Sequence, residues 1–191
     1  MLSIATVCIA WSGYQATKWA GHQAKHYAQA DAALVRASRS STLAGEEHLQ
    51  DLVNFNRWLD AETNGDQRLT DIYLRRFRKE FLPAFNAWLA LDPLTNVQAP
   101  ASPLLMPQYD LANRAKAGRL ETVGHARTVQ AEHDTENSDN YIFGTVVFAA
   151  VLFFAGISMR FAWFPMRVTV LILSGCFLMY GVVHLAGLEA L

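Results

Sequence analysis

Two stretches without any charged residue dominate the hydrophobic pattern of the chain. They cover residues 141–159 and 168–188, and in the second one His184 is the only side chain that titrates near neutral pH. Each stretch is about 20 residues long, which is the helix length that crosses the hydrocarbon core of a bilayer. The pattern therefore predicts membrane-spanning helices over residues 141–160 and 166–188.

The beginning of the chain predicts a shorter third span that continues into water. Residues 1–19 are mostly apolar and lack the basic start and the cleavage site of a signal peptide, so we interpret them as a retained anchor. From there, small residues recur at every fourth position, and residues four apart are neighbours on a helix surface. The row consists of Ser12, Ala16, Ala20, Ala24, Ala28 and Ala32. We expect it to pack against residues 126–131, because small side chains let two helix backbones approach closely.

The residues between the first two spans, 20–140, predict an antiparallel helical bundle. Gly45 is expected to end the first helix near Thr42, because glycine is a poor helix former, and a second helix is expected to follow. Asn64 and Gly65 form a turn signal that ends this second helix. The carboxylate of Asp66 can then cap a third helix.

Prolines shape the second half of this domain. Pro83 cannot donate a backbone hydrogen bond, so we expect a kink in the third helix there. Four prolines between residues 92 and 107 predict one long loop. From Gln108 to Pro165 no proline interrupts the chain, which predicts one helix that continues into the second span. The predicted fold is an all-α membrane protein with three transmembrane helices and a helical-bundle domain between the first two.

Charge and cysteine placement limit the possible functions. The formal net charge of −1 provides no basic field for nucleic acid. Cys8 and Cys176 both fall in predicted spans, so the middle domain has neither a disulfide nor a thiolate metal site. Arg160 and Arg167 flank the turn between the last two spans, which favours a cytoplasmic turn and an extracytoplasmic domain. Lys18 and Lys25, which follow the first span, favour the opposite orientation, and we prefer the first.

A first group of residues could hold a metal ion near the membrane surface. His22 and His26 are four residues apart and share a helix face. Antiparallel packing would bring His133 and Asp134 to the level of His26, completing a mixed histidine and carboxylate site. The alternative is a set of polar residues on solvated helices, which we favour because no cysteine is present and no third spaced ligand lies on the same helix.

A second group resembles a calcium-binding loop. Asp60, Glu62, Asn64 and Asp71 fall at positions 1, 3, 5 and 12 of an EF-hand loop, with Gly65 at position 6. However, position 8 is a glutamine instead of an apolar residue, and an aspartate at position 12 reaches a bidentate pose less easily than glutamate. An ordinary helix corner explains the same residues, and we favour it.

A basic cluster could bind anionic lipid or an acidic partner, although a solvated helix face partly paired with Asp71 and Glu80 is the simpler interpretation. It consists of Arg75, Arg76, Arg78 and Lys79. No convergent catalytic set or cofactor motif is present, so we expect no enzymatic activity and no cofactor.

Two segments carry a family resemblance. They are AWSGYQA at residues 10–16 and the stretch from RFRKEF at residues 76–81 to Trp88. Together they resemble an uncharacterised family of small bacterial membrane proteins with a helical domain between an N-terminal span and a C-terminal pair. The resemblance implies a multi-pass protein of the bacterial inner membrane and brings no activity with it.

The sequence therefore favours a non-enzymatic, membrane-anchored helical bundle that works by binding, as a sensor, scaffold or accessory subunit. The expected partners are membrane lipids and either further copies of the chain or another membrane protein. The alternative is a subunit of a small homo-oligomeric channel or transporter. The scarcity of polar side chains that could line a pore opposes this alternative. The glycines of the last two spans favour it: Gly144, Gly156, Gly175, Gly181 and Gly187.

Overall fold

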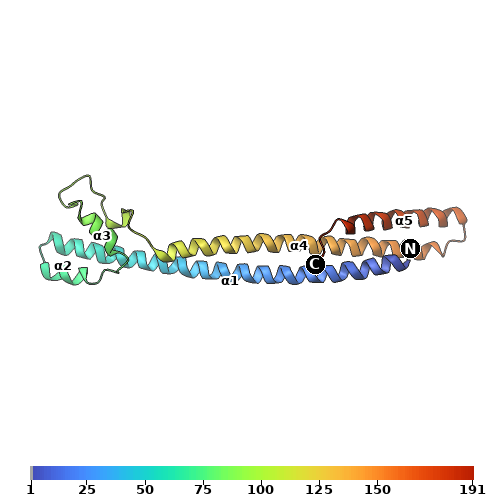
Figure 1. Ribbon diagram of the computed structural model, residues 1–191, viewed down its shortest axis with the longest axis horizontal. Coiled ribbons are helices and arrows are strands. Elements are labelled where there is room, and N and C mark those ends of the chain that lie inside the picture. The colour runs from blue at the N-terminus through green and yellow to red at the C-terminus, as the bar shows by residue number, and fades with distance from the viewer. Residues whose placement is uncertain (1) are drawn as a thin grey trace. The chain divides into compact units, whose positions relative to one another are not determined.

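The computed structural model describes residues 2–191, which form helices and connections without any strand (Figure 1). The elements are α1 (Leu2–Thr63), α2 (Gln67–Leu74), α3 (Leu82–Leu89), the 3₁₀ turn η1 (Pro103–Leu105), α4 (Ala112–Ser158) and α5 (Phe164–Ala186). The all-helical class is thus confirmed. Within residues 2–191, α4 and α5 are the two helices that are long and apolar enough to cross a membrane.

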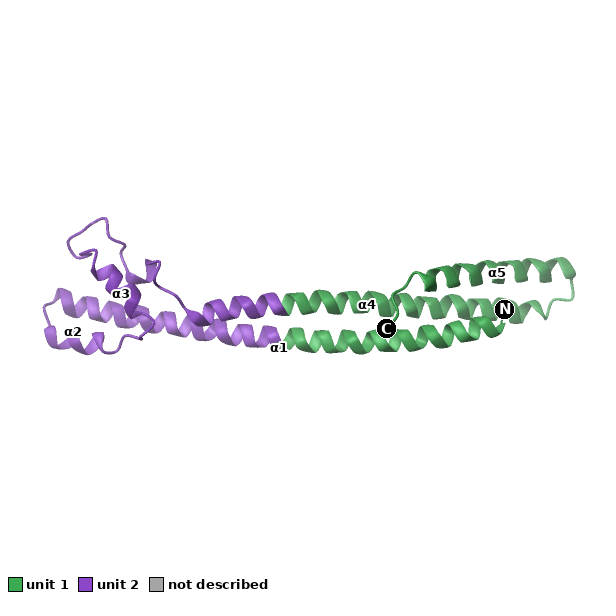
Figure 2. Cartoon of the chain, viewed as in Figure 1, with its two compact units in different colours: residues 1–32, 124–191 green, residues 33–123 purple. Residues whose placement is uncertain are grey.

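The chain divides into two compact units, which are described separately (Figure 2). Unit 1 contains residues 2–32 and 124–191, and unit 2 contains residues 33–123. The long helices α1 and α4 contribute residues to both units.

Helix α1 continues through the predicted break at Gly45. A glycine inside a helix costs about 1 kcal/mol relative to alanine, which neighbouring side-chain burial can offset. Ala44 and Asp51, on either side of Gly45, are 3% and 0% exposed, so this part of α1 is held by packing. The predicted helices before and after this glycine are therefore one helix. The end of this helix is as predicted from Asn64 and Gly65, because α1 stops at Thr63 and Gly65 has a φ of 73°.

The buried side of α1 advances by alternating steps of three and four residues. In unit 1 it includes Ser12, Ala16, Trp19 and Ala30, and in unit 2 Ala33, Ala37, Ser40 and Ala44. The predicted row at a constant spacing of four is wrong beyond Ala16, since Ala20, Ala24 and Ala28 are exposed. Each four-residue step turns an α-helix about 40° past a full turn. Buried positions with a mean spacing of about 3.5 residues instead remain on the side that faces the partner helix when two helices supercoil gently around each other. We call these buried positions of α1 the seam.

Helices α1 and α4 pack side by side in opposite directions within unit 1. Ala5 clusters with Phe148, and further along α1 the hydroxyl of Ser138 donates a 3.1 Å hydrogen bond to the carbonyl of Ala16. Within unit 1, α1 and α4 therefore run antiparallel. In the predicted contact region on α4, Ala131 is 0% exposed, whereas the side chain of Ala126 is exposed.

Helix α5 packs closely on α4 through a glycine. A Cβ atom added to Gly181 would lie 2.8 Å from the ring of Phe148 and 3.2 Å from Val147. About two turns earlier in α5, the hydroxyl of Ser174 donates a hydrogen bond to the carbonyl of Val151 in α4 at 3.1 Å. Gly181 therefore serves packing between α4 and α5 of one chain.

The residues after α5 bind back onto α1 and α4. The indole N–H of Trp19 and the hydroxyl of Tyr141 both donate to the carbonyl of Glu189, at 3.2 and 2.9 Å. The side-chain amide of Gln15, which is 0% exposed, pairs with both the N–H and the carbonyl of Leu191. These bonds satisfy buried polar side chains of unit 1 and fix the end of α5.

In unit 2 the single third helix of the prediction is two helices. Residues 75–81 separate α2 from α3, and Pro83 lies in the first turn of α3, where a missing N–H costs nothing. Pro83 therefore lies at the start of α3 and does not form the kink in a longer helix that we expected from the sequence. The predicted cap of α2 is confirmed, because Oδ1 of Asp66 accepts a 3.0 Å bond from the N–H of Leu69.

An aromatic cluster forms the core of unit 2. Its buried members are Phe55, Trp58, Phe77, Phe81, Phe85 and Trp88. Several rings meet edge to face, including Trp58 and Phe85 with centroids 4.8 Å apart. Such pairs add about 0.5–1.5 kcal/mol each to the burial of their area. The long loop before α4 closes on this core through Leu104 and Met106. Helix α4 then begins four residues later than predicted and runs unbroken through the predicted span, as expected.

Candidate functional site

A fully buried carboxylate organises the polar part of unit 2. Asp51, in α1, is 0% exposed. It accepts hydrogen bonds from Arg78, from Nε to Oδ1 at 3.0 Å and from Nη2 to Oδ2 at 2.7 Å. The hydroxyl of Tyr109 donates to the same Oδ2 at 3.1 Å. A two-point guanidinium–carboxylate pair of this kind is strong and fixes the relative orientation of both groups.

Further polar groups extend this network to the start of α4. Nη1 of Arg78 lies 3.6 Å from Oε1 of Glu47, which also accepts a 2.8 Å bond from the side-chain amide of Asn113. Nδ1 of His48 lies 3.2 Å from the hydroxyl of Tyr109. The network thus joins α1, the α2–α3 connection, the long loop and α4 within unit 2.

The environment of the network favours the protonated forms of its arginine and tyrosine. The hydrogen bonds that Arg78 donates to Asp51 raise the pKa of Arg78, against a smaller opposing effect of burial. Burial, followed by the charge of Asp51, raises the pKa of Tyr109. Arg78 remains a cation and Tyr109 a neutral donor, so both side chains keep their hydrogen bonds to Asp51 and hold segments of unit 2 together.

This network corrects the interpretation of the basic cluster. Arg78 was expected on a solvated or lipid-binding face, but its side chain is 15% exposed and paired with Asp51. The side chain of Arg75 donates to the carbonyl of Asp71 at 3.2 Å, and Arg76 lies over the ring of Tyr73. Asp51 itself was not singled out, although it continues the spacing of three and four residues that marks the buried side of α1.

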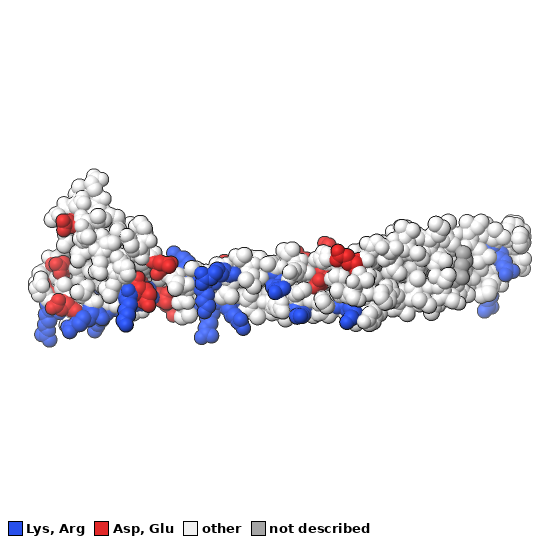
Figure 3. All heavy atoms as spheres, in the orientation of Figure 1, with Lys and Arg blue, Asp and Glu red and all other residues white. Residues whose placement is uncertain are grey.

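The most distinctive surface of unit 2 follows α3. Between Phe81 and Tyr109 the only charged residue is Asp92. Large apolar side chains are nevertheless exposed here, and we call them the apolar loop surface: Leu89, Leu91, Leu94, Val97 and Leu105. Val97 is 95% exposed. In Figure 3 the region of α3 and this loop is mostly white, and most of the Lys and Arg side chains in view lie away from it.

The backbone of the apolar loop surface is held in place by hydrogen bonds. Asp92 has a φ of 48°, and its carbonyl accepts from the N–H groups of Thr95 and Asn96 at 3.0 and 2.8 Å. The indole N–H of Trp88 donates to the carbonyl of Pro100 at 2.6 Å. A hollow of about 270 Å³ lies against the first of these turns, between Leu89 and Thr95. The exposed side chains therefore project from a fixed frame.

The first candidate metal group is only partly assembled. His26 and Asp134 meet, with Nδ1 and Oδ2 at 2.7 Å, as the antiparallel arrangement predicts. His22 turns its ring toward that of His26, at 6.3 Å between centroids. His133 instead faces Trp19, and its Nδ1 lies 3.4 Å from the amide of Asn137. Among residues 2–191 no three His, Cys, Asp or Glu side chains are arranged to hold a metal ion.

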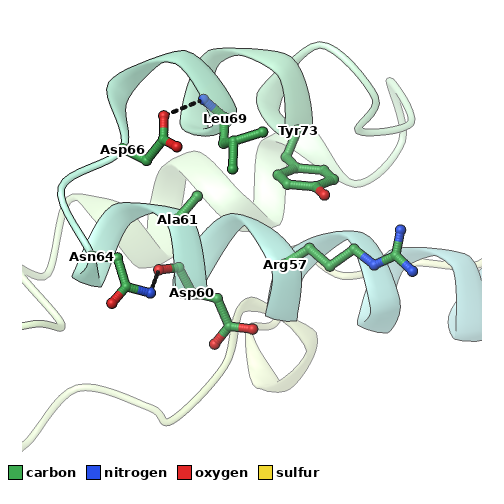
Figure 4. A pocket seen from close by; sticks show the side chains of 7 residues that line it. All are labelled: Arg57, Asp60, Ala61, Asn64, Asp66, Leu69 and Tyr73. Carbon is green, nitrogen blue, oxygen red and sulfur yellow. Dashed lines mark hydrogen bonds between the residues drawn. The ribbon is translucent and has the colours of Figure 1, made fainter.

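The second candidate group does not form a calcium loop. Asp60 and Glu62 lie in the last turns of α1, and Asp71 lies in α2. The amide of Asn64 donates back to the carbonyl of Asp60 at 2.7 Å, in an ordinary helix end. A surface hollow of about 340 Å³ borders this corner (Figure 4). It is lined by Arg57, Asp60, Ala61, Asn64, Asp66, Leu69 and Tyr73.

Comparison with known proteins adds no relative. No family model matches the chain, and neither a curated protein nor a solved structure matches it significantly.

Proposed function

We propose that this chain is a non-enzymatic, membrane-anchored helical protein that acts through binding, as a sensor, scaffold or accessory subunit. The observation that carries the proposal is the apolar loop surface, a nearly uncharged patch of exposed Leu and Val side chains. Large apolar side chains gathered on one part of a folded surface are typical of a protein–protein contact. Because the loop frame is already ordered, little conformational entropy is lost on binding.

Unit 1 would be the anchor, with the start of α1 as a third span beside α4 and α5. In support, Leu2 and Ser3 border the same hollow as Ala155 and Ser158, at the end of α4. The first 14 residues of α1 therefore extend along the apolar part of α4. Their outward side chains are large and apolar: Leu2, Ile4, Val7, Trp11 and Tyr14 are 42–68% exposed. Such an exterior suits hydrocarbon and does not suit water.

The direction of insertion follows from the arginines beside the turn between α4 and α5. Positive residues favour the cytoplasmic side, so unit 2 would lie outside the cytoplasm of a bacterial inner membrane. Single cysteines at Ala101 and Ala162, both exposed, test this in a chain with Cys8 and Cys176 replaced by alanine. An impermeant thiol reagent on intact cells should label position 101 only. Labelling at 162 alone would reverse the orientation.

The binding function is tested by photo-crosslinking in native membranes. A photoreactive amino acid at Val97 or Leu94 should yield one discrete adduct with a membrane protein or with a second copy of the chain. The same amino acid at Gln67, exposed on the charged side of unit 2, is the control. Equal adducts from Gln67, or none from either loop position, would remove the support for a binding surface here.

The alternative of a channel or transporter subunit receives less support from the glycines than expected. Gly181 lies against Phe148, and a Cβ on Gly144 would lie 3.4 Å from the hydroxyl of Ser12. Both contacts occur within one chain. Conductance in reconstituted bilayers would distinguish the two functions.

A further inference from the structure

Two arginines at one end of unit 1 have no acidic partner in the described chain. Arg160 lies in the connection between α4 and α5, Arg167 lies in the first turn of α5, and both are exposed. Neither takes part in a salt bridge among residues 2–191. The sequence places no carboxylate nearby, because residues 2–30 and 140–188 contain neither Asp nor Glu. A negative charge that pairs with these arginines therefore has to come from another molecule.

Arg167 borders a surface hollow of about 360 Å³ between the start of α1, the end of α4 and the start of α5. The lining changes character along the helices. Arg167 and Ser158 lie nearest the connection between α4 and α5, whereas Leu171 and Ala155 lie about one turn further from it. Leu2 adds an apolar side chain from α1. The hollow thus has a cationic edge near the connection and an apolar part toward the middle of the helices.

The connection beside the hollow presents large apolar and aromatic side chains at its surface. Met159, Trp163 and Phe164 are 64–75% exposed. Tryptophan is enriched at the headgroup level of a bilayer because its ring is amphipathic. On the face that Figure 3 shows, this end of unit 1 carries basic side chains and no acidic ones. With α4 and α5 as membrane spans, which is part of the proposed function, the hollow lies at the level of the phospholipid headgroups.

We infer that this hollow binds the phosphate group of an anionic phospholipid, with the guanidinium of Arg167 as the anchor and an acyl chain along Leu171 and Ala155. A planar guanidinium can donate to two phosphate oxygens at once. The two arginines without carboxylates favour a lipid with net negative charge, and basic pockets between membrane helices bind such headgroups. A free phosphate ion could reach the same guanidinium, but it would leave the apolar part of the hollow unused.

The test compares lipid binding by the purified full chain in a neutral detergent. The probes are phosphatidylglycerol and phosphatidylcholine with equal acyl chains, together with inorganic phosphate, and native mass spectrometry counts the bound lipids. The wild type should retain one phosphatidylglycerol in preference to phosphatidylcholine. Arg167→Gln should weaken this binding about tenfold, because hydrogen bonds between charged groups are lost. Inorganic phosphate at the concentration of the lipid should not displace it.

Arg160→Gln is the matched control, because it removes the same charge from the same connection but does not border the hollow. It should weaken binding by less than about threefold, as expected for an exposed charge. Ser3→Phe adds a ring at a residue that borders the hollow, leaves the charge unchanged and should also weaken binding. Ile4→Phe, at the neighbouring exposed position outside the hollow, should bind like the wild type.

Equal losses in Arg167→Gln and Arg160→Gln would show only a general attraction of anionic lipid and would overturn the inference. Unchanged binding in Ser3→Phe, or the absence of a retained phosphatidylglycerol, would overturn it as well. Displacement of the lipid by inorganic phosphate would identify a plain anion site instead. The thermal midpoint of each variant without added lipid should equal that of the wild type. The proposed anchor is tested separately, since it fails only if the wild-type chain leaves native membranes without detergent.

Discussion

Asp51 and Arg78 form a two-point ion pair across 27 positions of the chain, with hydrogen bonds of 3.0 and 2.7 Å. The carboxylate comes from the middle of α1 and the guanidinium from the connection between α2 and α3. Since Tyr109 donates to the same carboxylate, three separate segments of unit 2 converge on one buried charge. This buried charge makes unit 2 sensitive to single substitutions.

Replacement of Asp51 by alanine should strongly destabilise the protein. The variant leaves the guanidinium of Arg78, 15% exposed, without its main partner, and breaking a buried pair in this way costs about 3–5 kcal/mol. The measurement is the free energy of unfolding by chemical denaturation in detergent. Glu121→Ala, at an exposed position of α4, should change it by no more than about 0.5 kcal/mol. Equal effects of the two variants would contradict the role of the pair.

Tyr109 should make the stability of the protein fall at alkaline pH. Its pKa is raised in the folded chain, so the unfolded chain loses this proton first. The contribution is complete below the ordinary phenol value of about 10 and is lost as the pH rises toward the raised value. Tyr109→Phe should therefore show a shallower loss of stability above about pH 10. Tyr27→Phe, at an exposed site, should keep the wild-type slope.

The seam on α1 predicts opposite outcomes for two nearby alanines. Ala30 is 1% exposed, so Ala30→Leu overpacks the seam and should cost about 1–3 kcal/mol. Ala28 belongs to the predicted row but is exposed, and Ala28→Leu should change stability by no more than about 0.5 kcal/mol. Thermal unfolding gives the stability, and size exclusion gives the assembly state. Loss of assembly in Ala28→Leu alone would instead identify the exposed row as an interface between copies.

The close approach of α4 and α5 should not tolerate a methyl group at Gly181. Glycine to alanine normally favours a helix by about 1 kcal/mol, and Gly156→Ala should behave so, because no atom lies within 4 Å of its added Cβ. At Gly181 the added Cβ would lie 2.8 Å from the ring of Phe148, which is 0% exposed and cannot easily move. We expect Gly181→Ala to lower the thermal midpoint. A midpoint equal to that of Gly156→Ala would refute this packing.

Neither candidate cation group should bind a metal ion tightly. In the group around His26 one histidine contacts one carboxylate, and the residues around Asp60 belong to a helix end. Calorimetric titration of the purified protein with Zn²⁺ and with Ca²⁺ should show no micromolar binding. Binding that disappears in His26→Ala, or in Asp60→Ala, would show that a site assembles there in the presence of the ion.

The features that sequence predicted correctly rest on local physics. Residues 141–159 and 168–188 carry no charge, and the helices α4 and α5 that contain them are long and apolar enough to cross a membrane. The absence of proline after Gln108 permits the long helix α4. The carboxylate of Asp66 caps α2 through an N–H only three residues away. Each of these depends on neighbours along the chain, so the sequence alone determined it.

The features that only the tertiary structure decided depend on distant partners. Gly45 should end a helix by its propensity, but burial of the residues around it keeps α1 continuous. The sequence contains small residues at a constant spacing of four. The positions of α1 that pack against its neighbouring helix have a mean spacing near 3.5 instead, so Ala24 is exposed. Arg78 is one of several arginines in the sequence. Its two-point pair with Asp51, 27 positions away, distinguishes it from the others, because only folding brings that carboxylate within hydrogen-bond distance.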